Sequence, residues 1–376
     1  MKKEEIAEYV KYYEQLLLSQ CERAEKLNEK KQEKARSATV IGLIDGDGIG
    51  PIIMKEARRV LNGLLADEIA SGKIVLRDIE GLTIENRLKL GKPVPDETLC
   101  SVKQCDVLLK GPTTTPSGGK MESANVTLRR ELDLYANTRP VCVPEEGIDW
   151  MFFRENTEGE YTLGSKGIEL DGLLSMDFKV TTVAGTRRIA RAAYEYARKT
   201  GKKRVSIVTK SNIMKKTDGM FSRIAHEVAA EYPEIETDEY YIDIMTANLV
   251  NTAIRSSFKV FLLPNLYGDI ITDEAAQIQG GVGTAGSANI GDEYAMFEAI
   301  HGSAPRLIEA GLGDRANPAS ILTAAAMMLD HIGLGEKGEA LRKAIHSAQD
   351  SLNMTGDENG DTASAFGDAV IASLKA

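Results

Sequence analysis

The stretch from Lys259 to Asp273, KVFLLPNLYGDIITD, constrains the fold of this chain most. Its segment Val260–Leu263 is an apolar run long enough for a buried strand, and Pro264 ends that run. We therefore expect a strand followed directly by a helix. On that helix Asp269 and Asp273 are four residues apart, a spacing that places both carboxylates on one face.

The two carboxylates suggest a metal site. Like charges at this spacing repel each other by roughly 0.2–0.5 kcal/mol on an exposed helix, so a bound cation would explain why they stand beside a buried strand. Two oxygen ligands that leave room for water and substrate suit Mg²⁺ or Mn²⁺. The alternative is an ordinary solvated helix face.

Length and composition describe a globular protein. A chain of 376 residues predicts about two domains. The net charge of −10, without a compensating basic tract, argues against a nucleic-acid partner. No apolar run approaches the ~20 residues that cross a bilayer, and we expect no membrane association. The four cysteines have no CxxC spacing, which predicts neither zinc nor a disulfide framework, and we expect a cytoplasmic protein.

Residues 1–36 are rich in Lys and Glu and predict an amphipathic helix that packs on the body of the protein or on a partner. Its apolar residues stand at helical spacing: Ile6, Val10, Tyr13, Leu16 and Leu17. The many acidic residues argue against a secretory or organellar targeting peptide. We expect no chemistry in this segment.

A glycine-rich turn follows the predicted strand TVIGLI. The spacing of Gly46, Gly48 and Gly50 is that of a dinucleotide-binding fingerprint, but Pro51 stands where the fingerprint needs its last small residue. The nearest downstream acid, Glu68, falls in a helical pattern and not at the end of a second strand. We therefore reject a Rossmann fold and expect these glycines to permit a tight strand-to-helix turn near a ligand.

The segment KGPTTTPSGGKMESANVTLRRELDLYANTRP has the residue types that bind a polycarboxylate. Residues 111–119 predict an irregular loop, and Ser123 predicts a helix N-cap. Asn125 and Arg129 then lie one turn apart on one face, and Arg139 follows ten residues later. Arginine binds carboxylates bidentately, and such charge-assisted bonds are about twice as strong as neutral ones.

Other candidates follow predicted strands. Arg154 and Tyr161 come after an apolar strand, although Tyr161 alone would more often be a core or surface residue. Lys210 stands where the strand RVSIVT ends, and Asp243 stands at another strand-to-helix passage. Ligands gather at the carboxyl ends of strands in α/β sheets, so these residues are candidates for a site.

Seven motifs, in this order, resemble the β-decarboxylating dehydrogenases: GDGIGP, KGPTTTP, SANVTLRRELDLYANTRP, RENTEGEY, TKSNIMK, NLYGDIITD and FEAIHGSAP…ANP. That family contains isocitrate, 3-isopropylmalate and homoisocitrate dehydrogenases. The resemblance covers about residues 38–375. The N-terminal helix lies outside it, and Ile52 departs from the Glu usual after GDGIGP.

The resemblance implies an α/β fold of the two-domain isocitrate/isopropylmalate dehydrogenase type. Residues 1–36 would be an N-terminal helical extension. Residues 37–133 and 281–376 would form a large cofactor-binding domain. Residues 134–280 would form a small dimerisation and metal/substrate domain.

The resemblance also implies the chemistry, in which a 2-hydroxy acid is oxidised by a nicotinamide cofactor and then decarboxylated. Asp243, Asp269 and Asp273 would hold Mg²⁺ or Mn²⁺, and we expect no cationic side chain among them. Lys210 would take up the hydroxyl proton, and Tyr161 would protonate the enol carbon. Because the family takes the first Asp and the Lys from the opposite subunit, a homodimer is implied.

Binding residues are implied in the same way. Arg129, Arg139 and Arg154 resemble the clamp for the substrate carboxylates. The residues expected to bind the cofactor are Thr115, His301, Gly302, Ser303, Ala304, Pro305, Arg306 and Asn317.

Substrate choice depends on Ser123 and Asn125. The isopropylmalate branch has apolar residues near this position and the homoisocitrate branch has Arg, whereas Ser-x-Asn-x-x-x-Arg resembles the isocitrate branch. We therefore expect isocitrate. Two alternatives are a non-catalytic regulatory subunit, which would lose acid–base groups that this chain keeps, and a metal-dependent binding protein, which would leave HGSAP unexplained.

The residues that would select the cofactor conflict. NAD-specific relatives carry Asp just after HGSAP, whereas this chain has Arg306 and Leu307, and the Arg306 cation could bind a 2′-phosphate. Against this, Ser364 and Asp368 stand where NADP relatives place Tyr and Arg, and Arg306 could instead point into solvent. We favour NADP, with NAD as the alternative.

Overall fold

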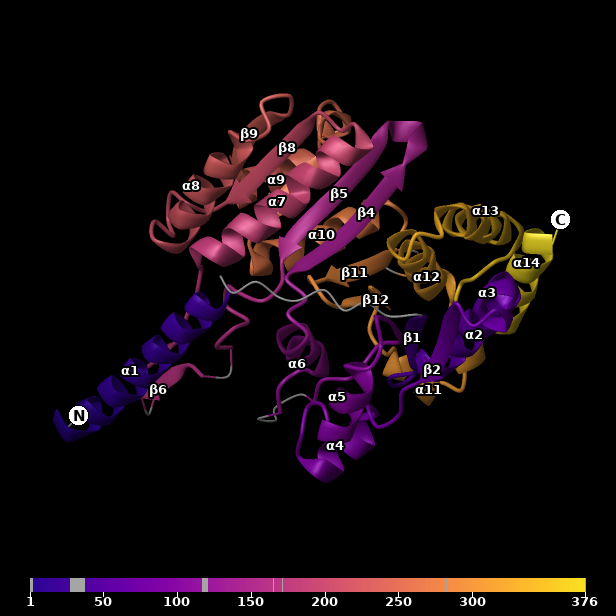
Figure 1. The fold of residues 1–376 in the computed structure, drawn as a ribbon, viewed down its shortest axis with the longest axis horizontal. Helices are drawn as coiled ribbons and strands as arrows, with labels where there is room; N and C mark the ends of the chain where they lie inside the picture. The colour runs from indigo at the N-terminus through magenta and orange to yellow at the C-terminus, as the bar shows by residue number, and fades with distance from the viewer. Residues whose placement is uncertain are drawn as a thin grey trace. The chain divides into compact units, whose positions relative to one another are not determined.

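The computed structural model describes residues 3–27, 38–116, 121–164, 166–170, 172–281, 283 and 285–375. It has a mixed α/β fold with a large sheet, as predicted. Two compact units divide the chain, one formed by Met1–Gln32 with Phe152–Ile271 and the other by Glu33–Met151 with Thr272–Ala376. We call them unit 1 and unit 2 (Figure 1). The domain division implied by the resemblance, with its separate functional assignments, stays a prediction.

Unit 1 is built around a parallel set of strands. Strand β8 pairs in parallel with β10 on one side and with β9 on the other, and α7 lies over β8 (Figure 1). A separate antiparallel ribbon is formed by β6 and β7. The elements that lie wholly or partly in unit 1 are α1 (Lys3–Lys26), β5 (Ile148–Glu155), β6 (Ile168–Leu170), β7 (Leu174–Met176), α7 (Val183–Thr200), β8 (Arg204–Thr209), α8 (Thr217–Ala229), β9 (Glu236–Tyr241), α9 (Ile242–Val250), η2 (Arg255–Ser257), β10 (Val260–Leu263) and α10 (Asn265–Ile278).

The strand and helix predicted from KVFLLPNLYGDIITD are confirmed. All four residues of β10 are buried, and α10 begins two residues after the strand ends. A proline between them suits this junction, because proline cannot donate to a sheet and is tolerated just before a helix. The junction therefore brings the carboxylates of α10 close to a strand end.

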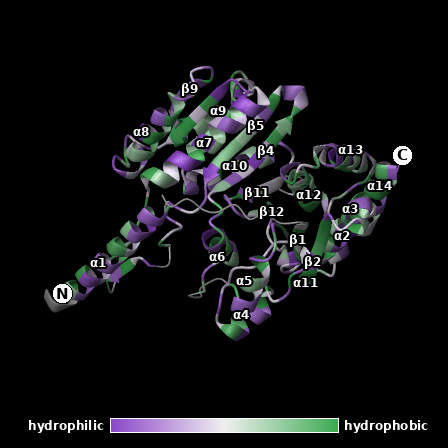
Figure 2. Cartoon of the chain, in the orientation of Figure 1, coloured by the Kyte–Doolittle hydropathy of each residue, from purple (hydrophilic) through white to green (hydrophobic). Residues whose placement is uncertain are grey.

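The helix predicted within residues 1–36 is α1, and residues 28–36 lie outside the described part of the chain. Hydrophobic and hydrophilic residues alternate along it (Figure 2). Leu16 is buried, but Ile6, Val10 and Leu17 are exposed. Tyr13 is also largely exposed, although its ring lies 5.6 Å from that of Phe178.

Unit 2 contains a mixed sheet in the order β2-β1-β3-β12-β11-β4. Strand β1 is parallel to β2 and β3, whereas β11 runs antiparallel to both β12 and β4. Its further elements are β1 (Thr39–Ile44), α2 (Gly50–Leu64), α3 (Ala66–Ala70), β2 (Ile74–Asp78), α4 (Ile84–Leu90), α5 (Asp96–Val102), β3 (Val107–Lys110), α6 (Ala124–Glu131), β4 (Ala136–Val143), η1 (Pro144–Glu146), β11 (Gly286–Ile290), β12 (Ala295–Ala299), α11 (Pro305–Glu309), η3 (Gly313–Arg315), α12 (Ala319–His331), α13 (Gly335–Ser351) and α14 (Ala363–Lys375).

Small residues hold α12 against the sheet of unit 2. This helix packs on β11, β12 and β3 and buries a face rich in alanine. A Cβ at Gly286 would lie 2.6 Å from the backbone nitrogen of Ala324, so β11 and α12 approach too closely for any side chain at that position. The close packing fixes β12, from which the HGSAP motif continues.

Two local predictions need correction. Arg154 lies inside β5 and does not follow the strand. Ser123 does occupy the N-cap position of α6, but its hydroxyl makes no capping hydrogen bond. Within the described residues, none of the helices is long and apolar enough to cross a membrane.

Candidate active site

In unit 1, two of the predicted site residues donate hydrogen bonds to the carboxylate of a third. The Arg154 guanidinium donates to Asp269 Oδ1, and the Tyr161 hydroxyl donates to Asp269 Oδ2 at 2.6 Å. Arg154 also lies over the Tyr161 ring, with 5.2 Å between its Cζ and the ring centroid. The structure therefore brings together a predicted acid and a predicted carboxylate-binding arginine from the RENTEGEY motif with a predicted metal ligand from NLYGDIITD.

The position of Arg154 depends on α10. Arg154 is 1% exposed, and Asn265 Oδ1 accepts hydrogen bonds from its Nε at 2.9 Å and from its Nη2 at 2.7 Å. A Cβ at Gly268 would lie 2.6 Å from the Arg154 Cγ, so only glycine lets this side chain pass under the first turn of the helix. The NLYGD sequence thus fixes the arginine as well as supplying the carboxylate.

A second pair in unit 1 joins Lys210 and Asp243. Lys210 follows the last residue of β8, and Asp243 lies in the first turn of α9, as the sequence predicts. Their Nζ and Oδ1 atoms are 2.6 Å apart, and the hydrogen bond from Lys210 lowers the pKa of the Asp243 carboxyl. The Asp243 side chain is 62% exposed, which leaves its oxygens open to an approaching group.

In unit 2, Arg139 is buried on β4 and donates through Nη1 to Asp273 Oδ1 at 2.9 Å and to the Thr272 hydroxyl at 2.6 Å. The Asp273 side chain is 64% exposed. One face of this carboxylate is therefore neutralised by arginine and the rest faces solvent.

The expectation that no cation lies among the three aspartates is wrong. Each carboxylate has its own cationic partner, which is Lys210 for Asp243, Arg154 for Asp269 and Arg139 for Asp273. Among the described residues, no three His, Cys, Asp or Glu side chains are close enough together to hold a metal ion. The carboxylate oxygens suit Mg²⁺ or Mn²⁺ chemically.

Arg129 belongs to a buried charged network in unit 2. Its Nη2 donates to Glu298 at 3.1 Å, and the Lys110 ammonium lies 3.2 Å from the other Glu298 oxygen. Burial alone would raise the pKa of Glu298, but the charges of Lys110 and Arg129 and a hydrogen bond from Asn289 outweigh burial and lower the pKa to about 2. Burial lowers the pKa of Lys110.

Arg129 keeps one hydrogen-bond donor that this network does not use. Arg129 Nε is buried and has no hydrogen-bond partner within the described part of the chain. A buried guanidinium nitrogen without a partner is costly, and an incoming carboxylate would satisfy it.

The candidate donors for a third substrate carboxylate lie on and before α6. Asn125 Oδ1 accepts a hydrogen bond from the Thr113 hydroxyl at 2.9 Å, and Ser123 is partly exposed just before the helix. Asn125 and Arg129 share α6, as predicted. The neighbouring Arg130 pairs with Glu122 at 2.7 Å, which leaves it outside this group.

Two loops of unit 2 converge on the GDGIGP turn. Gly46 and Gly48 have φ of 75° and 59°, which glycine adopts without strain. A Cβ on Gly48 would lie 2.0 Å from the Ser303 carbonyl oxygen, and one on Gly46 would lie 2.0 Å from the Pro112 carbonyl oxygen. The predicted tight turn is confirmed, and its glycines allow the loops that carry HGSAP and KGPTTTP to approach.

Hydrogen bonds hold these loops in place. Asp47 Oδ2 accepts from the backbone nitrogen of Thr114 at 2.7 Å and from the fully buried Arg87 at 3.1 Å. The hydroxyls of Thr114 and Ser303 are 2.8 Å apart, and Ile49 N donates to the Ser303 carbonyl at 3.0 Å. Neighbouring Thr115 is exposed on the same loop.

The HGSAP loop itself has unusual features. Ala304 has a φ of 46°, an uncommon value for a residue with a Cβ, and it directly precedes Pro305 in α11. Burial lowers the pKa of His301, whose Nδ1 lies 3.0 Å from the Gly302 carbonyl. Within the described residues His301 Nε2 is buried without a partner, so a neutral His301 offers an acceptor there.

Two further cofactor candidates, and one residue that speaks against NADP, are placed as follows. Arg306 is exposed in α11. Asn317 Oδ1 accepts from Ala319 N at 2.9 Å and so helps to begin α12. Asp368 is engaged by the Arg59 guanidinium from α2.

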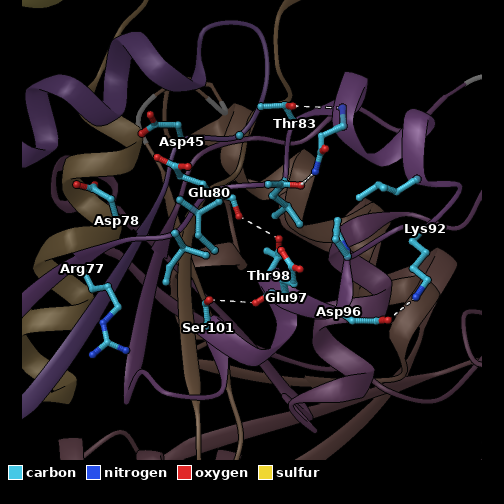
Figure 3. A pocket seen from close by; sticks show the side chains of 18 of the residues that line it. Asp45, Arg77, Asp78, Glu80, Thr83, Lys92, Asp96, Glu97, Thr98 and Ser101 are labelled. Atoms are coloured by element: carbon cyan, nitrogen blue, oxygen red, sulfur yellow. Dashed lines mark hydrogen bonds and ion pairs between the residues drawn. The ribbon is translucent and has the colours of Figure 1, made fainter.

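A large cavity lies elsewhere in unit 2. It measures about 1330 Å³ and is lined by residues of the segment from Ile44 to Gln104, including Asp45, Asp78 and Glu80 (Figure 3). Its charges are largely paired, since Arg58 contacts both Asp45 and Asp78, and Lys92 contacts Asp96. None of the predicted site residues lines it.

Sequence reasoning missed several polar partners of the predicted residues. They are Lys110, Thr113, Asn265, Thr272 and Glu298. Lys110 and Glu298 stand inside the quoted motifs KGPTTTP and FEAIHGSAP, so a charged residue in a buried strand was the available signal. The contacts themselves depend on the tertiary fold.

Comparison with known proteins identifies the family. A sequence model of the isocitrate/isopropylmalate dehydrogenase family matches residues 40–370. The chain belongs to this family of enzymes.

Relatives with different specificities resemble the chain to a similar degree. An NADP-dependent isocitrate dehydrogenase of Rickettsia prowazekii is 40% identical over 81% of this chain. Subunit 2 of an NAD-dependent mitochondrial isocitrate dehydrogenase of Schizosaccharomyces pombe is 36% identical, over 91% of this chain and 89% of the relative. A homoisocitrate dehydrogenase of Methanocaldococcus jannaschii is 36% identical, over 85% of this chain and 92% of the relative.

The matched region spans 62% of the length of the Rickettsia enzyme. Among solved structures, isocitrate dehydrogenase of Methylococcus capsulatus superposes with a TM-score of 0.80 at 34% identity, covering 90% of this chain and 100% of that one. The predicted family and fold class are thereby confirmed.

Proposed function

We propose that this protein catalyses the metal-dependent oxidative decarboxylation of isocitrate to 2-oxoglutarate, with reduction of NADP or NAD. The observation that carries the proposal is the cluster in which Arg154 and Tyr161 both donate to Asp269. A binding protein without chemistry would not need an acid beside a carboxylate-binding arginine. The names of two relatives and of the superposed structure support isocitrate as the substrate.

Two side chains would move the protons. Lys210, as the neutral amine, would accept the proton of the substrate hydroxyl, and Tyr161 would later donate a proton to the enol carbon. Both have a carboxylate within hydrogen-bond distance, Asp243 for the lysine and Asp269 for the tyrosine. These contacts orient the two side chains before substrate binds.

Three arginines would bind the substrate carboxylates. Arg129, Arg139 and Arg154 are each largely buried, so their charges are poorly screened and attract carboxylates strongly. Ser123 and Asn125 would donate to the γ-carboxylate, which distinguishes isocitrate from a substrate with an apolar group there.

Asp243, Asp269 and Asp273 would hold Mg²⁺ or Mn²⁺, with Asp243 and Lys210 supplied by the second chain of a homodimer. A bound divalent ion would act as a Lewis acid that favours loss of the hydroxyl proton and stabilises negative charge on the enolate.

The nicotinamide cofactor would bind at the loop from His301 to Arg306, with Asn317 and Thr115. The strained Ala304 and the buried His301 Nε2 support this assignment, because both are costly unless they serve binding. We favour NADP because exposed Arg306 could pair with a 2′-phosphate, and NAD is the alternative. We further propose a cytoplasmic protein, with neither nucleic acid nor a membrane as a partner.

Homoisocitrate is the second candidate substrate, because a homoisocitrate dehydrogenase is among the relatives at similar identity. 3-Isopropylmalate is the third, and a non-catalytic regulatory subunit is a further alternative. The test is to measure initial rates with all three acids, each with NAD and with NADP, in the presence of Mg²⁺ or Mn²⁺. We expect the highest kcat/KM with isocitrate. A higher value with either other acid would refute the substrate assignment, and no turnover of any of them would favour the regulatory subunit.

A further inference from the structure

The N-terminal helix α1 precedes residues 40–370, which the family model matches, yet it contacts a loop of the candidate active site within unit 1. Near its end, Arg23 donates through Nη1 and Nη2 to Glu158 Oε1 at 3.2 and 3.1 Å. Arg23 Nη2 also donates to the Thr157 carbonyl at 3.2 Å. Both partners belong to the 156–164 loop, which carries Tyr161.

The Glu158 carboxylate is held on several sides. Its side chain is only 3% exposed, and it accepts from the backbone nitrogen of Thr182 at 2.8 Å, at the N-terminus of α7. A Cβ on Gly185 would lie 2.4 Å from Glu158 Oε1, so α7 is packed directly against the carboxylate. Arg23 pairs with this buried carboxylate, and a buried carboxylate that loses a cationic partner is costly.

A chain of hydrogen bonds connects the backbone of Glu158 to Arg154, Asp269 and Tyr161. Asn265 Nδ2 donates to the Glu158 carbonyl at 2.9 Å, and the other end of the same amide accepts from Arg154. Arg154 in turn donates to Asp269, which also receives the Tyr161 hydroxyl. Each step is a hydrogen bond between buried or half-buried groups.

We propose that Arg23 is a positioning residue for the candidate active site. By neutralising Glu158 and holding the Thr157 carbonyl, it fixes the 156–164 loop and thereby the amide of Asn265 that orients Arg154. The proposal deepens the proposed function and rests on it for the roles of Arg154 and Tyr161. The competing explanation is that Arg23 only docks α1 onto the unit.

Charge supports the assignment. Burial and the charge of Glu155 raise the pKa of Glu158 to about 7, whereas the charge of Arg23 and hydrogen bonds from Thr182 oppose this rise. Without Arg23 the carboxyl would take up a proton more readily, and a protonated Glu158 would hold its partners less firmly. Activity of an Arg23 variant should therefore decline at pH values where the wild type is fully active.

The test compares the full-length wild type with Arg23→Ala, Arg23→Lys, Glu158→Gln and the control Lys26→Ala. Lys26 is an exposed cation on the same helix, so its loss changes the charge of α1 without touching the loop. Hydrogen–deuterium exchange across residues 156–164 reports loop order without any need for turnover. Steady-state kinetics with isocitrate reports the orientation of Arg154 and Tyr161.

We expect exchange in residues 156–164 to become about tenfold faster in Arg23→Ala, because three charge-assisted hydrogen bonds are lost. We also expect about a tenfold lower kcat and a raised KM for isocitrate, with an unchanged KM for the cofactor. Arg23→Lys should recover part of both effects, and Lys26→Ala should match the wild type.

Faster exchange confined to α1 in Arg23→Ala, with wild-type exchange in residues 156–164, would overturn the proposal and leave α1 docking as the role of Arg23. If Arg23→Ala does not fold, the same comparison is made with Arg23→Lys and Glu158→Gln, and unchanged loop exchange in both would also overturn it. A wild type that does not turn over isocitrate would refute the proposed function, while the exchange comparison would still decide whether Arg23 orders the loop.

Discussion

The Lys210 ammonium lies 2.6 Å from the Asp243 carboxylate of the same chain. Because the two side chains contact each other, the proposed proton acceptor and the proposed metal ligand must enter an active site together. If a second chain supplies one of them to the site that contains Tyr161, it supplies both.

This coupling predicts a complementation pattern in mixed dimers. Lys210→Met and Tyr161→Phe should each be inactive, but dimers formed from both should regain about a quarter of wild-type activity. Half of the dimers would be mixed, and each mixed dimer would contain one intact site. Co-expression with two different tags and assay of the mixture measures this.

The control for complementation is the mixture of Lys210→Met with Asp243→Asn. Because each site of that mixed dimer lacks one of the two residues, no activity should return. Recovery in this control, or none in the first mixture, would contradict a site shared in this way.

Substrate choice is tested at Ser123. Ser123→Asp would place a carboxylate beside the γ-carboxylate of isocitrate, and the repulsion should cost several kcal/mol, about 3 or more if the pair is desolvated. We expect a large rise in KM for isocitrate, whereas Ser123→Ala should have a smaller effect. An unchanged KM in Ser123→Asp would place Ser123 outside the site.

Cofactor choice is tested at Arg306. If its exposed guanidinium binds a 2′-phosphate, Arg306→Asp should lower kcat/KM for NADP by roughly 10- to 100-fold and spare that for NAD, since a charge-assisted pair contributes about 1.5–3 kcal/mol. Kinetics with both cofactors in wild type and variant give the answer. A wild type that prefers NAD, with no further loss of NADP activity in the variant, would exclude Arg306 from reading the phosphate.

Stability should depend on the protonation of Glu158. Its pKa is raised to about 7 by burial and by Glu155, against the opposing charge of Arg23, so the native state binds this proton more tightly than the unfolded state. The protonated Glu158 carboxyl therefore stabilises the native state. This contribution to the unfolding free energy is fully present below the unfolded-state pKa near 4.5 and is lost as pH rises through about 7.

The comparison is with Glu158→Gln, which cannot ionise. Between pH 5 and pH 8 the unfolding free energy of the wild type, measured with urea, should fall relative to that of the variant by roughly 1–3 kcal/mol. If the unfolding free energies of the two proteins changed with pH in the same way, a raised pKa of Glu158 would be contradicted.

The sequence was sufficient to predict the strand-to-helix junctions that carry the site residues. The apolar run of β10, the proline after it and the four-residue spacing in α10 predicted a strand, a junction and a helix that are all present. Lys210 and Asp243 were placed correctly at strand-to-helix passages for the same reason.

The sequence was not sufficient to predict the partners of the charged residues. The spacing of Asp269 and Asp273 suggested a metal cation, but the cations beside them in this chain are Arg154 and Arg139, from strands more than a hundred positions away. Lys110 and Glu298 form a buried ion pair between two strands that are otherwise apolar, and nothing in either strand's own sequence indicates this partner. Such contacts depend on strand order and packing, which local patterns do not contain.

The most direct test of the proposed function is the stoichiometry of the reaction with isocitrate. In the presence of Mg²⁺ or Mn²⁺ the protein should form one 2-oxoglutarate and one CO₂ for each nicotinamide cofactor reduced. Excess chelator should abolish all three, and added metal should restore them. Absence of 2-oxoglutarate, or full activity in chelator, would contradict the account.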